Sequence, residues 1–190
     1  KKRTKKKAGQ LAGKAKNKSY KQILIACCLP AQKGTYVGDD RNDEIIEKDF
    51  NDQAQLLEPF VDFFYLDVIS SSKEIKIANN ILKKFNKPIL IGLHISKNGR
   101  LPSNETIFKT VQENQNKRWL GVVMACVSPE IIQNSIDEMT ILNIPFVFKA
   151  NIWKMDPIPA DVIHKKNKHY YYKHGKKLNT LIAKRTDNTQ

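Results

Sequence analysis

The stretch WLGVVMACVSPE, residues 119–130, decides the fold class because a buried segment passes directly into the start of a helix. Its first half is an apolar run that must be buried, as a core strand is. Ser-Pro-Glu follows, and a proline such as Pro129 is favoured at the first position of a helix. Cys126 therefore stands at the carboxyl end of a predicted strand, where α/β proteins carry their functional side chains.

Apolar runs and helical patterns alternate along the rest of the chain. The predicted strands cover residues 22–30, 61–70, 87–96, 119–128 and 144–153. The predicted helices cover residues 39–60, 72–85, 104–117 and 129–142. Most strands are apolar on both faces, which is typical of parallel strands with helices on one side and a core on the other. The fold class is therefore α/β, either a (β/α) barrel or an open doubly wound sheet. No G-x-G-x-x-G motif follows a strand, so the dinucleotide-binding fold lacks its fingerprint.

The net charge of +14 is concentrated at the two ends of the chain. Residues 1–22 hold ten Lys or Arg and no acid, and residues 164–190 hold eight Lys or Arg and one acid. Residues 23–163 hold fifteen basic and eighteen acidic residues, a net charge of −3. We therefore expect a basic N-terminal segment (1–22), a central domain (23–155) and a basic C-terminal segment (156–190). Such ends bind nucleic-acid backbones or are simply solvated.

Side chains that can react or bind ligands stand at the ends of the predicted strands. They are Cys27 and Cys28, Asp67, His94 and Ser96, Cys126, and Asn151. Because the carboxyl ends of parallel strands meet at one rim, these thiols, carboxylate, imidazole and amide are expected to surround one mouth. Three cysteines do not form a secreted disulfide framework, so free thiols or metal ligation are expected. No apolar run is long enough to span a membrane, and we expect a cytoplasmic protein.

Five motifs, in order, resemble the homocysteine S-methyltransferase family, whose members are zinc-dependent (β/α)8 barrels. The segments are ILIACCLPAQKGTYVGDD (23–40), FNDQAQLLEPFVDFFYLDVISSSKEIKIA (50–78), KPILIGLHISKNGRLPSNET (87–106), GVVMACVSPEII (121–132) and PFVFKANIW (145–153). They are similar to the third to seventh strands of the family and the turns that follow them. The resemblance covers residues 20–155 and implies a partial TIM-type barrel of about five parallel β/α units.

The resemblance also implies a chemistry. In the family, three cysteine thiolates hold zinc, and homocysteine binds the open position through its sulfur, which loses its proton. That sulfur takes a methyl group from a sulfonium or betaine-type donor, which gives methionine. By position, Cys126 corresponds to one zinc ligand. Asp67, where the family has Glu, corresponds to the residue that holds the homocysteine amino group, and Asn151 lines the same pocket.

The chain departs from the family pattern at both ends. The first two strands have no counterpart, and the Gly-Gly-Cys-Cys pair that supplies the other zinc cysteines is missing. Cys27-Cys28 matches that pair in letters only, because adjacent residues of a strand point to opposite faces. The chain is thus expected to be a piece of a methyltransferase, completed by a partner chain, or a shortened relative. Whether it is itself an enzyme stays open.

Two other interpretations stay open. A catalytically inactive, truncated barrel would act as an assembly module or bind near RNA, with Tyr170, Tyr171 and Tyr172 available to stack on bases. A different α/β enzyme would use Cys126 as a nucleophile, with a pKa depressed by the following helix and with His94 as its base. His164, His169 and His174 lack the cysteine spacing of a zinc finger and are expected at the surface.

Overall fold

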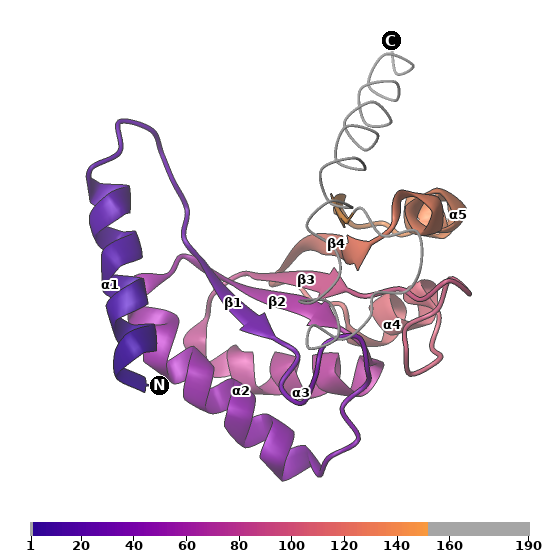
Figure 1. Cartoon of the computed structure of the whole chain (residues 1–190), viewed down its shortest axis with the longest axis horizontal. Coiled ribbons are helices and arrows are strands. Elements are labelled where there is room, and N and C mark those ends of the chain that lie inside the picture. The colour runs from indigo at the N-terminus through magenta and orange to yellow at the C-terminus, as the bar shows by residue number, and fades with distance from the viewer. Residues whose placement is uncertain (1, 152–190) are drawn as a thin grey trace, which may run out of the picture.

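The computed structural model describes residues 2–151, which form one sheet of five parallel strands in the order β1-β2-β3-β4-β5 (Figure 1). The strands are β1 (Ala26–Pro30), β2 (Phe63–Ile69), β3 (Ile89–Leu93), β4 (Trp119–Val127) and β5 (Phe146–Ala150). The helices are α1 (Lys2–Asn17), α2 (Asp43–Leu57), α3 (Ser72–Leu82), α4 (Ile107–Asn114) and α5 (Pro129–Thr140). Short 3₁₀ turns, η1 (Glu58–Phe60) and η2 (Lys83–Phe85), follow α2 and α3. The predicted α/β class is confirmed.

Each helix that follows β2 or β4 begins at a capping side chain. The Ser71 hydroxyl accepts a hydrogen bond from the backbone N–H of Glu74, and the Ser128 hydroxyl accepts one from that of Ile131. These bonds satisfy backbone donors that the first turn of a helix leaves without partners. Pro129 occupies the first turn of α5, as the sequence predicts. The chain therefore turns sharply at the carboxyl ends of both strands.

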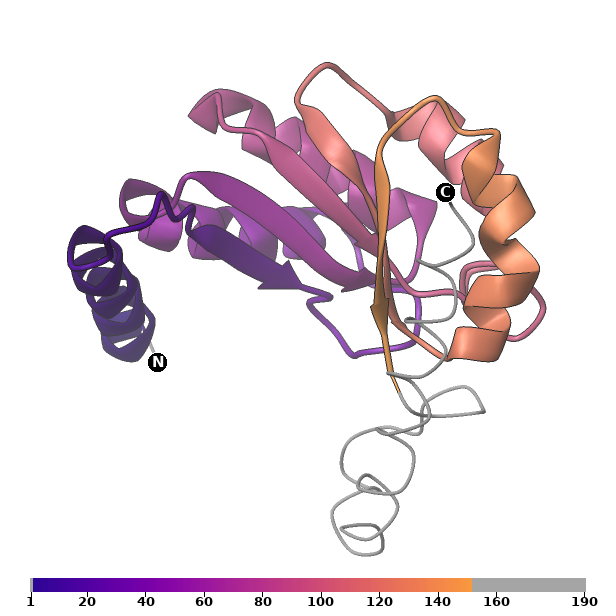
Figure 2. The same cartoon turned by 90° about the horizontal axis from the view of Figure 1, so that it is seen from above.

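The two faces of the sheet differ in composition. The face toward the helices forms the main core, to which Phe64 and Leu66 of β2 contribute fully buried side chains. Figures 1 and 2 show α2, α3, α4 and α5 following this face, with α1 at one end of the row and α5 at the other. The opposite face carries a smaller apolar cluster of Val68, Val123 and Ala125. We call this second face the inner face, because it corresponds to the interior of a barrel.

An ion pair across the inner face shows that the sheet is curved. The Lys149 Nζ on β5 lies 2.9 Å from Asp67 Oδ1 on β2, although β3 and β4 lie between these strands. In a flat sheet, three strand spacings would separate β2 and β5 by roughly 14 Å. The side chains of Lys and Asp are too short to span that distance easily. The sheet must therefore curve and bring β2 and β5 closer together on the inner face. The five strands therefore make part of a barrel wall.

Gly92 on β3 leaves room for a large side chain on the inner face. A Cβ atom at this position would lie 2.7 Å from the Leu66 carbonyl oxygen and 2.8 Å from the Tyr65 hydroxyl. The missing side chain thus lets Tyr65 of β2 lie across the neighbouring strand. Tyr65 in turn lies beneath the Lys149 ammonium, which is 5.5 Å from its ring centroid.

Irregular residues occur at the carboxyl ends of β2 and β4. Val68 and Cys126 have φ angles of 58° and 56°, in the left-handed region that side chains other than glycine rarely adopt. The strand register shifts at both places, between Leu66 and Ile69 and between Ala125 and Val127. Such bulges redirect side chains and concentrate at functional sites. Both strands are therefore reshaped at the rim where the sequence places its candidate site.

Within residues 2–151, no helix is long and apolar enough to cross a membrane. The expected cytoplasmic location stays a prediction, as does the division into segments 1–22, 23–155 and 156–190. The basic C-terminal segment, with Tyr170, Tyr171, Tyr172 and the three histidines His164, His169 and His174, lies outside the described residues.

Candidate functional site

The three residues predicted to form the site come from three strand ends that share one rim. Asp67 lies near the end of β2, Cys126 near the end of β4, and Asn151 directly after β5. The Asn151 side-chain amide donates a hydrogen bond to the Cys126 carbonyl oxygen at 2.7 Å. The Asn151 backbone N–H donates to the Val127 carbonyl oxygen at 2.9 Å. Asn151 thus holds the bulge of β4 in its left-handed conformation, and the amide and the thiol belong to one local structure.

Lys149 is a rim residue that the sequence reasoning missed. Its ammonium donates to both oxygens of Asp67, at 2.9 and 3.0 Å. Desolvation lowers the pKa of Lys149, but the hydrogen bond and negative charge of Asp67 outweigh it and raise the pKa overall. The signal was available in the alternation of β5, where Phe146 packs toward the core and residues 147 and 149 take the other face. A lysine at an inward position of an apolar strand indicates a polar interior.

The Asp67–Lys149 pair is partly open to solvent. The side chain of Asp67 is 17% exposed, and that of Lys149 is 48% exposed. Charges in such a position are neither fully hydrated nor fully buried, so a ligand reaches them without opening the core. The rim therefore presents one negative and one positive group side by side, next to the Cys126 thiol.

The Cys126 thiol is not activated in this structure. Burial raises its pKa, while the Lys149 charge and a hydrogen bond with Tyr36 lower it by less. The pKa of Cys126 is raised overall, opposite to the depressed pKa expected at the start of α5, and desolvation by burial is the largest cause. The Tyr36 ring packs against His94, with ring centroids 4.7 Å apart. The cysteine-nucleophile interpretation therefore loses its main physical support.

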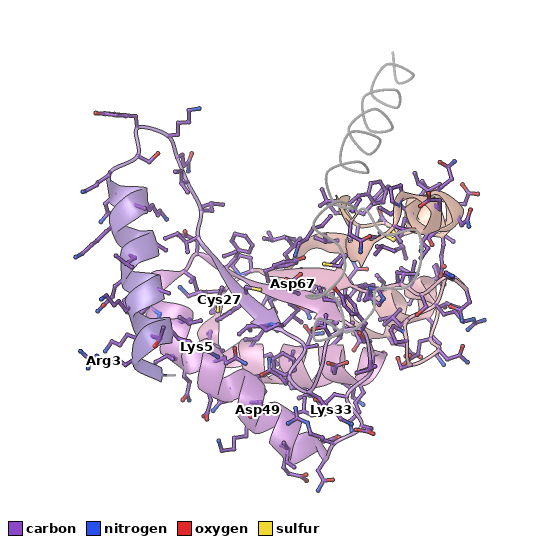
Figure 3. All side chains as sticks on the ribbon, in the orientation of Figure 1. Arg3, Lys5, Cys27, Lys33, Asp49 and Asp67 are labelled. Atoms are coloured by element: carbon purple, nitrogen blue, oxygen red, sulfur yellow. The ribbon has the colours of Figure 1, made fainter. Side chains whose placement is uncertain are left out.

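The adjacent cysteines point to opposite faces, as the strand pattern predicts. Cys27 is buried in the core, where desolvation raises its pKa to about 12. Cys28 lies on the inner face, 3.6 Å from Asp67 Oδ2, and desolvation together with the Asp67 charge raises its pKa to about 11. Figure 3 labels Cys27 and Asp67, which lie on neighbouring strands. Of the predicted mouth, Cys28, Asp67, Cys126 and Asn151 reach the rim, whereas Cys27 and His94 are buried.

Whether the site could hold zinc depends on how many ligating side chains lie close together. Between residues 2 and 151, no group of three His, Cys, Asp or Glu side chains is placed to hold a metal ion. Zinc sites in proteins use three or four such ligands. Cys126 offers one thiol at the expected position, but the described residues do not fit zinc by themselves.

The profile of the family described as homocysteine S-methyltransferase matches residues 1–181. This match covers nearly the whole sequence, including the basic helix and the segment after β5. The chain belongs to the homocysteine S-methyltransferase family. The resemblance that the five motifs carry is thereby confirmed.

Solved structures agree with this assignment at the level of the fold. The metallated homocysteine methyltransferase MmuM from Escherichia coli is similar to the chain with a TM-score of 0.68 at 15% identity, over 79% of this chain and 58% of that one. The oxidized form gives a TM-score of 0.69 at 16% identity over 79% and 57%, and the apo form 0.61 at 12% over 77% and 61%. No curated protein sequence matches the chain.

The chain spans a little under three fifths of the length of the metallated enzyme, because 58% of that structure is covered. The five-stranded arc and the partial TIM-type barrel predicted from the sequence correspond to this shared part.

Proposed function

We propose that this chain forms the homocysteine-binding rim of a methyltransferase barrel, which transfers a methyl group from a sulfonium or betaine-type donor to homocysteine and yields methionine. One observation carries the proposal. In a chain of the homocysteine S-methyltransferase family, Asp67, Cys126 and Asn151 gather at the carboxyl rim together with a lysine. Methyltransferases of this family act on the same small substrate, and the rim of a barrel is where such substrates bind.

The charges of the rim suit an amino-acid head group. Asp67 would accept hydrogen bonds from the homocysteine ammonium, and Lys149 would donate to its carboxylate. The ion pair between Asp67 and Lys149 would then be replaced by two ion pairs with a zwitterion, so no charge is left without a partner. In this position the homocysteine thiol extends away from the pair, toward the part of the rim that Cys126 and Asn151 occupy.

Zinc is the part of the family chemistry that the described residues do not supply. Cys126 is the rim thiol that would join a zinc site, and the other ligands would come from a partner chain. When bound in such proteins, zinc keeps a coordinated thiol deprotonated at neutral pH. The roles proposed for Asp67, Lys149 and Asn151 do not depend on the metal, because they concern the head group.

Calorimetric titration with homocysteine and two analogues tests the proposal. The analogues are 3-mercaptopropylamine, which lacks the carboxylate, and 4-mercaptobutyrate, which lacks the ammonium. Asp67→Asn is expected to weaken homocysteine binding by roughly tenfold or more, as for loss of a charged hydrogen bond. The same variant should strengthen the binding of 4-mercaptobutyrate, because Lys149 loses its Asp67 partner and is free to pair with the carboxylate. Asp137→Asn, on the exposed face of α5, is the matched control.

Lys149→Met gives the complementary arm of this test. It should weaken homocysteine and strengthen 3-mercaptopropylamine, because Asp67 loses its Lys149 partner and is free to pair with the ammonium. Lys76→Met, on the exposed face of α3, is its control. Equal affinity of the wild-type chain for all three thiols would contradict head-group recognition. Failure of homocysteine to bind at all would contradict the proposed function.

A second candidate is a catalytically inactive barrel segment that acts as an assembly module. The donor set favours it, since the described residues hold no three groups placed for a metal ion. This candidate predicts that homocysteine does not bind, so the two functions separate in the same titration.

A further inference from the structure

Helix α1 has a cationic outer side that the methyltransferase chemistry does not use. The helix contains Lys or Arg at seven of its positions in the sequence KRTKKKAGQLAGKAKN and no acidic residue. Four of these cations, Arg3, Lys6, Lys7 and Lys14, are exposed to solvent and face no acidic residue of their own helix. We call these four residues the cationic stripe.

The inner side of α1 explains why the stripe is fixed in place. Gly9 is buried against Phe60, so closely that a Cβ atom would lie 2.8 Å from the phenyl ring. On the same side, the Lys5 ammonium donates to Gln53 at 2.8 Å, and Lys16 pairs with Asp62 at 2.7 Å. Figure 3 shows Lys5 on the side of α1 toward the body and Arg3 pointing away from it. The helix is therefore docked in one orientation.

The spacing of the stripe aligns its charges along the helix. Three of its four members, Arg3, Lys7 and Lys14, are separated by four and seven positions, so they lie on one face. Eleven residues at the rise of an α-helix place Arg3 and Lys14 roughly 16 Å apart. A linear row of cations matches a linear row of phosphates better than it matches a single anion.

An unpacked aromatic side chain lies just beyond the helix. Tyr20 is fully exposed, at 106% of its reference area, and Lys18 and Lys21 on either side are exposed as well. Proteins that bind single-stranded nucleic acids combine a positively charged track with aromatic rings on which bases stack. A membrane surface fits less well, because Leu11 is the one large apolar side chain that α1 exposes within the described residues.

We propose that α1 and Tyr20 bind single-stranded nucleic acid, with the cationic stripe along the phosphates and the Tyr20 ring stacked on a base. Such binding is electrostatic and largely independent of sequence. It is separate from the rim, and it does not require zinc or homocysteine.

The test is the salt dependence of binding, measured on the full chain by fluorescence anisotropy with a labelled twelve-nucleotide oligouridine. The stripe variant carries Arg3→Gln, Lys7→Gln and Lys14→Gln. Its slope of log K against log salt should be smaller by about 2, since each phosphate contact contributes about 0.7 for a single strand. The control variant carries Lys76→Gln, Lys83→Gln and Lys117→Gln, three exposed lysines elsewhere, and changes the net charge equally. Its slope should be unchanged.

Tyr20→Ala supplies an independent readout. Loss of one stacked base should weaken binding by roughly fivefold to a hundredfold without changing the salt slope. Equal slopes in the stripe and control variants would overturn the proposal, because the general positive charge of the chain would then explain binding. Binding to vesicles of anionic lipid without binding to the oligouridine would overturn it too. Circular dichroism of each variant shows whether α1 is retained, and an oligodeoxythymidine probe distinguishes RNA from DNA.

Discussion

At the scale of single residues, the Asp67 carboxylate determines the electrostatics of the rim. It accepts hydrogen bonds from Lys149 and lies 3.6 Å from the Cys28 sulfur. Its charge raises the pKa values of Cys28 and Tyr65, each already raised by desolvation. One carboxylate therefore keeps the neighbouring thiol and phenol protonated while it holds a lysine charged.

This arrangement predicts the effect of Asp67→Asn on Cys28. Removing the negative charge should lower the pKa of Cys28 from about 11, because the thiolate no longer forms beside a carboxylate. The rate of Cys28 alkylation by iodoacetamide, followed by peptide mass spectrometry, should then rise at a lower pH. Cys27 is the internal control, since its pKa of about 12 is set mainly by burial in the core. An unchanged pH profile for Cys28 would contradict the electrostatic account.

A second prediction at this scale concerns Gly92. In Gly92→Ala the new methyl group would collide with the Leu66 carbonyl and the Tyr65 hydroxyl, and overpacking of this kind costs about 1–3 kcal/mol. Gly13→Ala is the control, because a Cβ atom there has nothing within 4 Å and α1 should gain roughly 0.5–1 kcal/mol. Urea unfolding measures both free energies. Equal effects of the two substitutions would contradict the close approach of Tyr65 to β3.

At the scale of elements, the sequence predicts which segments form strands and helices better than where they begin. All five predicted strands are found, but β1 begins at Ala26 rather than at residue 22. The helix predicted from residue 104 begins at Ile107, because Asn104 takes a φ of 79° and Thr106 caps the helix. Apolar periodicity indicates what is buried, whereas the exact helix start depends on which of several possible capping residues is used and on hydrogen bonds that loops make with distant segments. Ser103, for example, donates to the Ser70 carbonyl oxygen.

The start of α3 carries a pH-dependent prediction. Glu74 is fully buried, and desolvation raises its pKa despite hydrogen bonds from Ser71 and Asp39. A carboxyl with a raised pKa in the folded state stabilises the fold below its unfolded pKa, and this contribution is lost as the pH rises through the folded pKa. Glu74→Gln removes the charge and should therefore stabilise the protein more at pH 7 than at pH 4.

The comparison of free energies of unfolding at the two pH values isolates this effect. Asp39 acts with the opposite sign, since hydrogen bonds from Arg41 lower its pKa and its contribution is lost as the pH falls. Asp39 contacts Glu74 and its charge also raises the Glu74 pKa, so the two groups are coupled and Asp39→Asn is measured in both backgrounds as the control. A difference between wild type and Glu74→Gln that does not change with pH would contradict the burial of an ionisable Glu74.

At the scale of the whole molecule, the arc of five strands brings side chains from β2, β4 and β5 to one rim. Asp67, Cys126 and Asn151 stay predicted site residues, and their shared position was predictable because the strand ends of an α/β fold lie at one rim. Lys149 was missed because its partner Asp67 is 82 positions away in the sequence. The motifs predicted the family, but the curvature of the sheet, which brings Lys149 of β5 to Asp67 of β2, follows from the three-dimensional structure.

The ion pair between Lys149 of β5 and Asp67 of β2 is expected to orient ligands more than to stabilise the curved sheet. With side chains 48% and 17% exposed, the Lys149–Asp67 pair should contribute less than about 1 kcal/mol to stability. Lys149→Met should therefore leave the urea midpoint nearly unchanged, while homocysteine affinity falls. A large loss of stability would instead show that the arc needs the pair to stay curved.

The most direct test of the central claim is the zinc content of the purified chain, measured with Cys126→Ser as the control. Cys126 is proposed to join a zinc site that the described residues do not complete. The isolated wild-type chain should therefore hold less than stoichiometric zinc, and Cys126→Ser should not change that amount. About one zinc per chain, lost in Cys126→Ser, would contradict the account, since the chain would then hold a complete metal site of its own.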